Sequence, residues 1–300
     1  MRKRFQIGKF RFELSLPDEI EIPFNMSKFM LKEDSDWFKS REIDMFYELE
    51  FKDEIESYIS DLKAMKDDQK EVIRPDFQMF YVNQLECRLI GIKGCPDFYA
   101  VSLQKEERKV AVTIHSSYKE WMSHDTIFAS LLMLEKFMLE KDSFILHSSY
   151  TCTDGKALLF SAPSETGKST QSALWEQYKG ARTINGDRSL LYQKEGQWVA
   201  DGWPVCGDSG ICKKENYPIR AIVMLRQAKE NRAYRLKPMQ AFQEIFSQVT
   251  VNGWNRGFQG KVMDLLERLI RDVPVYRLEC DISKEAVDCL FLALYESEKD

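Results

Sequence analysis

Hydrophobic and polar positions follow two different patterns along this chain, and the change between them divides it. Up to about residue 115, apolar and polar side chains alternate in several short segments, which predicts half-buried strands. These segments are Phe10–Leu16, Phe46–Phe51 and Lys109–Ile114. Beyond them, continuous apolar runs mix with helical spacing. We therefore expect an α/β protein with a strand-rich N-terminal region of unknown role, residues 1–120, and a second region, residues 121–300.

The second region opens with a clear helical pattern. Ser123 is expected to cap this helix, and Asp125 lies in its first turn, where an acidic side chain complements the helix dipole. A broad apolar face follows, made of Ile127, Phe128, Leu131, Leu132, Leu134, Phe137 and Met138.

After this helix the pattern changes to strand, strand, loop and helix. Phe144–Tyr150 reads as the first strand. Lys156–Ala162 is a continuous apolar run, as expected of a strand buried in the centre of a sheet. A helix is expected over Lys168–Tyr178 and a second buried strand over Ala221–Gln227. The remaining expected elements are helices over Pro238–Gln248, Gly260–Arg271 and Ser283–Tyr295, and a strand over Val275–Cys280.

Composition narrows the class of protein. The 300 residues are 44% hydrophobic and 30% charged, as in ordinary globular proteins, and the net charge is -5. That charge favours neither nucleic acid nor an acidic membrane as a partner. Seven cysteines without a repeated spacing indicate free thiols in a reducing compartment. No apolar run resembles a signal peptide or a membrane span. We expect a cytoplasmic protein.

The stretch between the central strand and its helix, SAPSETGKST, resembles a phosphate-binding loop of the pattern G-x-x-x-x-G-K-[ST]. Such a loop turns backbone N–H groups and a helix N-terminus towards phosphates. A lysine then holds the β- and γ-phosphates and a hydroxyl contacts Mg²⁺. We therefore expect ATP and Mg²⁺ as cofactors, with Ser169 on the metal. The expected nucleotide-binding residues in the loop are Ser164, Glu165, Thr166, Gly167, Lys168, Ser169 and Thr170.

Two positions depart from that pattern. Ala162 replaces the first glycine, which matters only if the backbone there requires a positive φ. Glu165 places a carboxylate beside the phosphates, at a cost of roughly 1 kcal/mol in high dielectric. We expect weakened binding that is not abolished. The alternative is a chance match, since G-K-S-T alone is common.

Three segments together resemble a known family. Leu146–Ser149 (LHSS), the loop itself and Ile184–Leu191 (INGDRSLL) are similar to the core of HPr kinase/phosphorylase, and most of all to the shorter HPr-kinase-like proteins. These are relatives of the phosphoenolpyruvate carboxykinase fold. The resemblance covers residues 144–191 well and extends weakly through Gly202–Gly210 (GWPVCGDSG) and Pro218–Leu236. It implies a carboxykinase-like P-loop core for the second region.

The resemblance also implies an ATP-dependent kinase that acts on a hydroxyl. In the family, an aspartate pair supplies a metal contact and a base, and a histidine neighbours that base. Here Gly186 replaces the first aspartate and Asp187 remains. We expect His147, Asp187 and Lys168 to be catalytic, and Asp187 to share Mg²⁺ with Ser169. The alternatives are that Asp187 is a turn residue and His147 a structural one.

Several other residues have both a functional and a structural interpretation. Arg226 ends a predicted strand and would emerge beside Lys168 if that strand neighbours the loop strand. We expect it to bind there and neutralise the charge of the transferred phosphate; the alternative is a surface arginine. The segment Asp201–Cys212 could cover the phosphates or receive the acceptor, with Asp208 and Ser209 as the residues to mutate. The remaining candidates are read as structural: Cys206 and Cys212 as no metal pair, Trp203 and Trp254 as core residues, and His115 and His124 as surface residues.

The function that these residues favour is phosphorylation of a hydroxyl on a peptide, protein or small molecule. The partners are then a nucleotide and an unidentified acceptor, and a homo-oligomer is an open option. A second hypothesis is a nucleotide sensor or scaffold that has lost catalysis, which Glu165 and Gly186 favour. Carboxykinase-type phosphoryl transfer to an enolate is a third, but the chain has no evident ligand set for a second metal.

Overall fold

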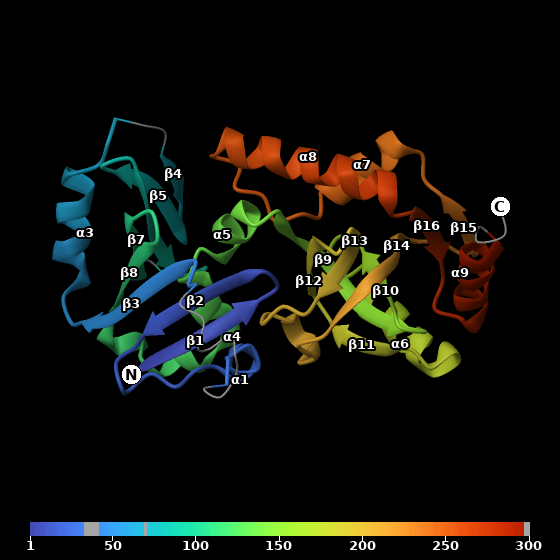
Figure 1. The fold of residues 1–300 in the computed structure, drawn as a ribbon, viewed down its shortest axis with the longest axis horizontal. Coiled ribbons are helices and arrows are strands. Elements are labelled where there is room, and N and C mark those ends of the chain that lie inside the picture. Colours follow the sequence, from blue (N-terminus) through green and yellow to red (C-terminus); the bar gives the residue numbers. More distant parts are fainter. Residues whose placement is uncertain (33–41, 69–70, 96, 297–300) are drawn as a thin grey trace. The chain divides into compact units, whose positions relative to one another are not determined.

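The chain divides into two compact units, Met1–Phe137 and Met138–Asp300. The structure, a computed structural model, describes residues 1–32, 42–68, 71–95 and 97–296. Within the described residues each unit holds one large sheet, so the protein is mixed α/β, as the hydrophobic pattern predicts (Figure 1).

The first unit is built on a mixed sheet in which the outer strands are antiparallel. The strand order is β1-β2-β3-β8-β7-β6-β5-β4, with β3 parallel to both β2 and β8. The three strands predicted from alternation are confirmed as β2, β3 and β8. The strands are β1 (Arg2–Ile7), β2 (Phe10–Ser15), β3 (Met45–Lys52), β4 (Val72–Arg74), β5 (Phe77–Val82), β6 (Leu85–Gly91), β7 (Phe98–Glu106) and β8 (Lys109–His115). The α-helices among the described residues of this unit are α1 (Phe24–Ser27), α3 (Ile55–Ala64) and α4 (Asp125–Ser130), and α5 (Leu134–Glu140) contains the boundary between the two units.

The single helix predicted after Ser123 is wrong, because the segment is broken into α4 and α5. The backbone at Met133, between them, has φ +47°. Side chains from the sheet bind the carbonyls at the break: Tyr47 donates to Leu132 at 2.7 Å and Ser102 donates to Leu131 at 2.7 Å. These bonds replace helical ones, so packing overrides the helical pattern. Ser123 does not cap α4 either, since its hydroxyl donates to a preceding carbonyl.

The second unit confirms the strand, strand, loop and helix order predicted around the phosphate loop. Its strands are β9 (Ser143–Thr153), β10 (Lys156–Ser161), β11 (Arg182–Asn185), β12 (Arg188–Lys194), β13 (Gln197–Asp201), β14 (Asn216–Gln227), β15 (Arg232–Arg235) and β16 (Val275–Cys280). Its helices are α6 (Lys168–Lys179), α7 (Pro238–Phe246), α8 (Arg256–Asp272) and α9 (Lys284–Glu296). Helix α8 begins before the predicted Gly260, because the Asn255 side chain caps it by accepting from Phe258 N at 3.0 Å.

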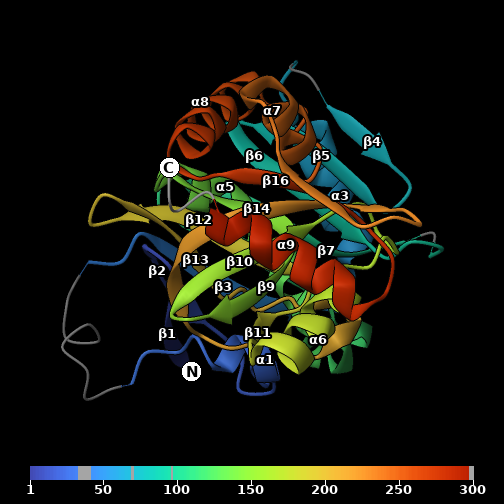
Figure 2. The same cartoon turned by 90° about the vertical axis from the view of Figure 1, so that its right-hand side faces the viewer.

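Alternating side chains of β10 supply two apolar cores, one on each face of the sheet. Ala157 and Leu159 belong to the core under α7 and α8, whereas Leu158 and Phe160 belong to the core under α6 and α9. Figure 2 shows these two helix pairs on opposite sides of the strands. A strand buried on both faces needs a continuous apolar sequence, which is why Lys156–Ala162 could be recognised from the pattern.

Strand β9 changes partners halfway along, and this change places the candidate site. Its first half pairs with β12, where His147 lies opposite Arg188. Its second half pairs with β10, where Ser148 lies opposite Ser161. The start of β12 and the end of β10 therefore meet at His147. None of the helices in the described residues is both long enough and apolar enough to span a bilayer.

Candidate functional site

The phosphate-loop sequence forms a turn from the end of β10 to the first residue of α6. Gly167 stands at the helix start with φ +111°, a conformation that other residues rarely adopt. Among the residues that the structure describes, the backbone N–H groups of Glu165, Thr166 and Gly167 have no hydrogen-bond acceptor. Free N–H groups at a helix N-terminus are the arrangement that attracts anions.

The two departures from the loop pattern have different structural consequences. Ala162 is buried and its φ is not positive, so alanine fits there without strain. Glu165, in contrast, has φ +63°, in the left-handed region that favours glycine. Its side chain is exposed. Glu165 is therefore unfavourable in this loop because of its backbone conformation as well as its charge.

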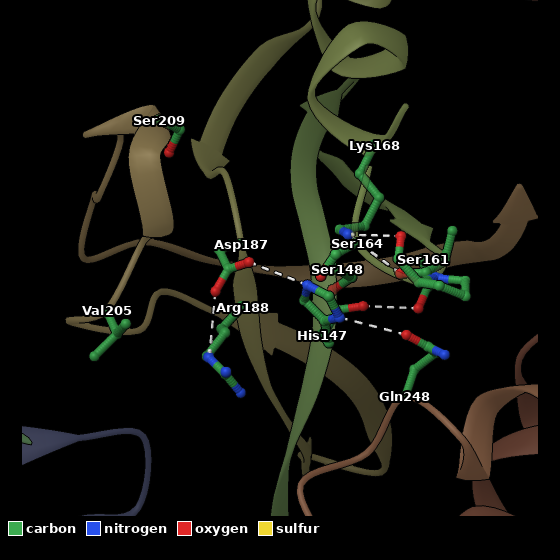
Figure 3. Close-up of polar contacts among 12 residues, drawn as sticks. His147, Ser148, Ser161, Ser164, Lys168, Asp187, Arg188, Val205, Ser209 and Gln248 are labelled. Carbon is green, nitrogen blue, oxygen red and sulfur yellow. Dashed lines mark hydrogen bonds and ion pairs between the residues drawn. The ribbon is translucent and has the colours of Figure 1, made fainter. Parts of the chain in front are cut away.

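Lys168 is buried at the start of α6, and its ammonium reaches back to the loop. Its Nζ donates to the carbonyl of Ala162 at 3.2 Å and to that of Pro163 at 3.4 Å. Burial lowers the pKa of Lys168, and the charge of Asp187 opposes that shift. The charges of the ammonium and the carboxylate thus influence each other. Figure 3 shows the Lys168 side chain reaching back to the loop and Asp187 beside His147.

His147 and Asp187 form the central pair of the site. Nε2 of His147 lies 3.1 Å from Oδ1 of Asp187, and Oδ2 of Asp187 lies 3.3 Å from Nε of Arg188 (Figure 3). The hydrogen bond from His147 lowers the pKa of Asp187, and Arg188 and Lys168 lower it further, against the effect of burial. Asp187 is therefore held as a carboxylate beside a buried cation.

A buried asparagine shapes the turn that carries Asp187. The Oδ1 atom of Asn185 accepts from the backbone N–H groups of Asp187 and Arg188, each at 2.9 Å. Asn185 is fully buried. The interpretation of Asp187 as a turn residue is thus correct for its backbone, while its side chain still faces His147 and Lys168.

Sequence reasoning missed two residues that support this pair. Gln248 directs Oε1 to Nδ1 of His147 at 3.3 Å, and its carbonyl accepts from His147 N at 2.9 Å. Thr250 accepts from Nη1 of Arg188 at 3.2 Å. Both residues follow α7, far along the chain from β9, and no local pattern in the sequence marks them.

The other predicted residues take various places. Strand β14 runs parallel to β10, with Met224 opposite Ser161, so Arg226 does emerge at the same end of the sheet as the loop. Its side chain is 70% exposed and lies 3.6 Å from Glu279. Ser164, Ser169 and Asp208 are exposed. The predicted roles of Arg226 and Ser164 at the phosphates, of Ser169 at the nucleotide and Mg²⁺, and of Asp208 in the Asp201–Cys212 segment stay predictions.

The residues read as structural lie at different depths in the protein. Cys206, Cys212 and Trp203 are buried, and Trp254 is half-buried. Within the described residues no group of three or more His, Cys, Asp or Glu side chains is arranged to hold a metal ion. A single carboxylate such as Asp187 is nonetheless a usual protein ligand for Mg²⁺, which keeps waters and nucleotide phosphates as its other ligands.

The fold and the site define an α/β protein in which a strand–loop–helix segment of phosphate-loop sequence lies next to a histidine–aspartate pair. A model of the family described as "SynChlorMet cassette protein ScmC" matches residues 110–288, which is more than half of the chain. The chain therefore belongs to the ScmC family. That description states no activity.

Comparison with solved structures adds little. The HPr(Ser) kinase/phosphatase from Coxiella burnetii is 12% identical to the chain. The alignment covers 52% of this chain and 90% of that one, with a TM-score of 0.31. A likeness this slight carries no argument about function, so the kinase expectation stays a prediction. No curated protein matches the chain.

Proposed function

We propose that this protein is a Mg·ATP-dependent kinase that phosphorylates a hydroxyl on a peptide, a protein or a small molecule. The observation that supports this most is the hydrogen-bonded pair of His147 and Asp187 within the electrostatic reach of Lys168, at the first turn of a phosphate loop. Phosphoryl transfer needs an anion cradle, a cation and a carboxylate in one place, and these residues are its protein components.

In the proposed reaction, Lys168 leaves the carbonyls of Ala162 and Pro163 and contacts the phosphates, which are stronger acceptors for its charge. The free N–H groups of the loop bind the phosphate oxygens. Bound Mg²⁺ would neutralise charge on the phosphates, and Asp187 and Ser169 are the residues that would hold it.

The acceptor oxygen forms a bond to the γ-phosphorus while the bond from that phosphorus to the β–γ bridging oxygen breaks, and ADP leaves. The acceptor proton passes to the carboxylate of Asp187. His147 orients that carboxylate through the bond at 3.1 Å, and its imidazole assists proton removal by taking the proton on from Asp187. A loose transition state with little need for a strong base suits a single carboxylate of lowered pKa.

A second candidate function is a nucleotide sensor that binds ATP without transferring phosphate. The left-handed backbone and exposed carboxylate of Glu165 favour it, because both weaken the loop. Turnover separates the two functions, since a sensor binds Mg·ATP and leaves the γ-phosphate in place.

The first test is calorimetric binding of Mg·ATP to the wild type, to Lys168→Ala and to the control Lys229→Ala, which removes an exposed lysine. We expect the wild type and the control to bind alike and Lys168→Ala to lose at least about tenfold in affinity, as for a charge-assisted contact of 1.5–3 kcal/mol. Transfer of γ-labelled phosphate to protein, peptide or small-molecule fractions then tests for a kinase. Absence of binding by the wild type at millimolar nucleotide would overturn the proposal.

A further inference from the structure

The loop from Trp203 to Cys212, between β13 and β14, lies against the turn that carries Asp187. The side chain of Asn185 joins the two, because its Nδ2 donates to the carbonyl of Trp203 at 2.7 Å and to that of Val205 at 3.3 Å. An isolated bridge between Asn185 and Cys212 adds a second connection. Figure 3 shows Val205 and Ser209 on the side of Asp187 that faces away from His147.

Gly186 leaves the space in which Ser209 sits. A Cβ atom added to Gly186 would fall well inside van der Waals contact with both Oγ and Cβ of Ser209. Because the Cβ of the serine is involved, rotating its hydroxyl does not relieve the clash. The φ of Gly186 is not positive, so the requirement for glycine is steric and does not come from the backbone conformation.

Gly207 brings the same loop against Asp187 itself. A Cβ on Gly207 would lie 3.1 Å from Cβ and 3.2 Å from Cγ of Asp187, so the backbone of Gly207 packs on the flank of that side chain. His147 lies on the other side, 3.1 Å from Oδ1. The Asp187 side chain is therefore held between the loop and the histidine.

Ser209 shapes the turn that makes this contact. Its hydroxyl donates to the carbonyl of Cys206 at 2.6 Å and accepts from Ile211 N at 3.2 Å. These bonds close the short 3₁₀ turn Gly207–Ser209. The side chain thus fixes the loop backbone at one end and fills the space over Gly186 at the other.

We propose that Ser209 is a positioning residue for Asp187, and that Gly186 is present because Ser209 occupies its side-chain space. The inference rests on the proposed function for its catalytic meaning, although the packing relation stands without it. The glycine at position 186 then leaves room for Ser209. The aspartate that the family resemblance leads one to expect at this position would displace Ser209.

A mutant cycle tests this relation. Gly186→Ala, Ser209→Gly and their combination are compared with Gly260→Ala, a control in α8 whose added methyl group meets no atom within 4 Å. We expect Gly186→Ala to lower the melting temperature by about 3–10 °C, as for an overpacked site. In the Ser209→Gly background, Gly186→Ala should lower the melting temperature by less than half of that amount, because the clash is gone. An equal fall in melting temperature in both backgrounds overturns the inference.

The imidazole signal of His147 reports whether the loop positions Asp187. The chain has only three histidines, so a proton–carbon NMR spectrum resolves them, and His147→Gln assigns the signal. We expect Gly186→Ala to move the His147 signal and Gly260→Ala to leave it in place. If the melting temperatures are coupled but this signal does not move, Ser209 packs on Gly186 without positioning Asp187, and the inference is wrong.

Two further measurements complete the design. Ser209→Ala keeps the Cβ fit and breaks the turn, so it should also move the His147 signal, even if Gly186→Ala fails to fold. Where the wild type transfers phosphate, Gly186→Ala should lower turnover about tenfold or more. Its Mg·ATP affinity should fall less than that of Lys168→Ala, since Lys168 and the loop N–H groups still bind the phosphates. A wild type without turnover refutes the proposed function, whereas the melting and NMR results still decide the role of Ser209.

Discussion

Nε2 of His147 lies 3.1 Å from Oδ1 of Asp187, and the pairing of β9 with β12 brings the two residues together. Arg188, which follows Asp187, is the register partner of His147. The end of β10 meets the same point through the bond from Ser161 Oγ to the His147 carbonyl at 2.7 Å. One change of strand partner along β9 therefore assembles the proposed base, its histidine and the phosphate loop.

Asp187→Asn should change the dependence of stability on pH. The pKa of Asp187 is lowered in the folded state, first by the hydrogen bond from His147. A lowered carboxylate pKa stabilises the fold above the ordinary value of 3.8, and this contribution disappears as the pH falls through the lowered pKa. Urea unfolding should thus show a larger difference between wild type and Asp187→Asn at pH 7 than at pH 3.

Asp264→Asn is the control for this experiment, because it removes an exposed carboxylate from α8. Its effect on the free energy of unfolding should be small at both pH values. If the difference between wild type and Asp187→Asn stays the same at pH 7 and pH 3, Asp187 gains no stabilisation from ionisation, and its pairing with His147 is not as described.

Glu165→Gly should tighten Mg·ATP binding and stabilise the protein. Glycine relieves the left-handed conformation at φ +63°, for a net gain of about 0.5–1 kcal/mol in the free energy of unfolding after its own entropy cost. Removing the carboxylate adds roughly 1 kcal/mol of binding, which is about fivefold in affinity. Calorimetry and urea unfolding measure the two effects.

Glu165→Gln separates the two causes, because it removes the charge and keeps the side chain on the left-handed backbone. Glu165→Gln should bind Mg·ATP more tightly than the wild type, and its free energy of unfolding should not increase. Should neither variant bind Mg·ATP more tightly than the wild type, Glu165 does not weaken the phosphate site.

Ala162→Gly restores the pattern glycine and should nonetheless bring no benefit. The alanine is fully buried and its φ is not positive. Glycine adds backbone freedom in the unfolded chain and removes a buried methyl group, so we expect a loss of about 1–2 kcal/mol in the free energy of unfolding. Mg·ATP affinity should be unchanged. A clear gain in affinity would show that the loop needs glycine there when it closes on phosphate.

His147→Gln should lower phosphate transfer by roughly 10²-fold, within the range for proton-transfer assistance. The glutamine amide can still donate to Asp187, but it cannot exchange a proton. Mg·ATP affinity should stay close to that of the wild type, because Lys168 and the loop N–H groups remain. His115→Gln, in the first unit, is the control. Equal turnover in both variants would make His147 a structural residue.

The strands and helices around the loop could be predicted because each has a strong local signal. A buried strand such as β10 shows a continuous apolar run, and Gly167 marks the start of α6. The single helix predicted after Ser123 is wrong because the hydroxyls of Tyr47 and Ser102 donate hydrogen bonds to backbone carbonyls in the middle of the expected helix. Such bonds depend on side chains far away in the sequence, so periodicity does not reveal them.

The sequence by itself determined the strand–loop–helix order, the candidate lysine, histidine and aspartate, and the α/β class, because these follow from residue types at short spacings. Only the tertiary structure decided which departures from the pattern matter. It gave Glu165 a left-handed backbone and Ala162 an ordinary one. It also placed Ser209 over Gly186 and Gln248 beside His147. Those contacts join residues that lie far apart in the chain, and only folding brings them together.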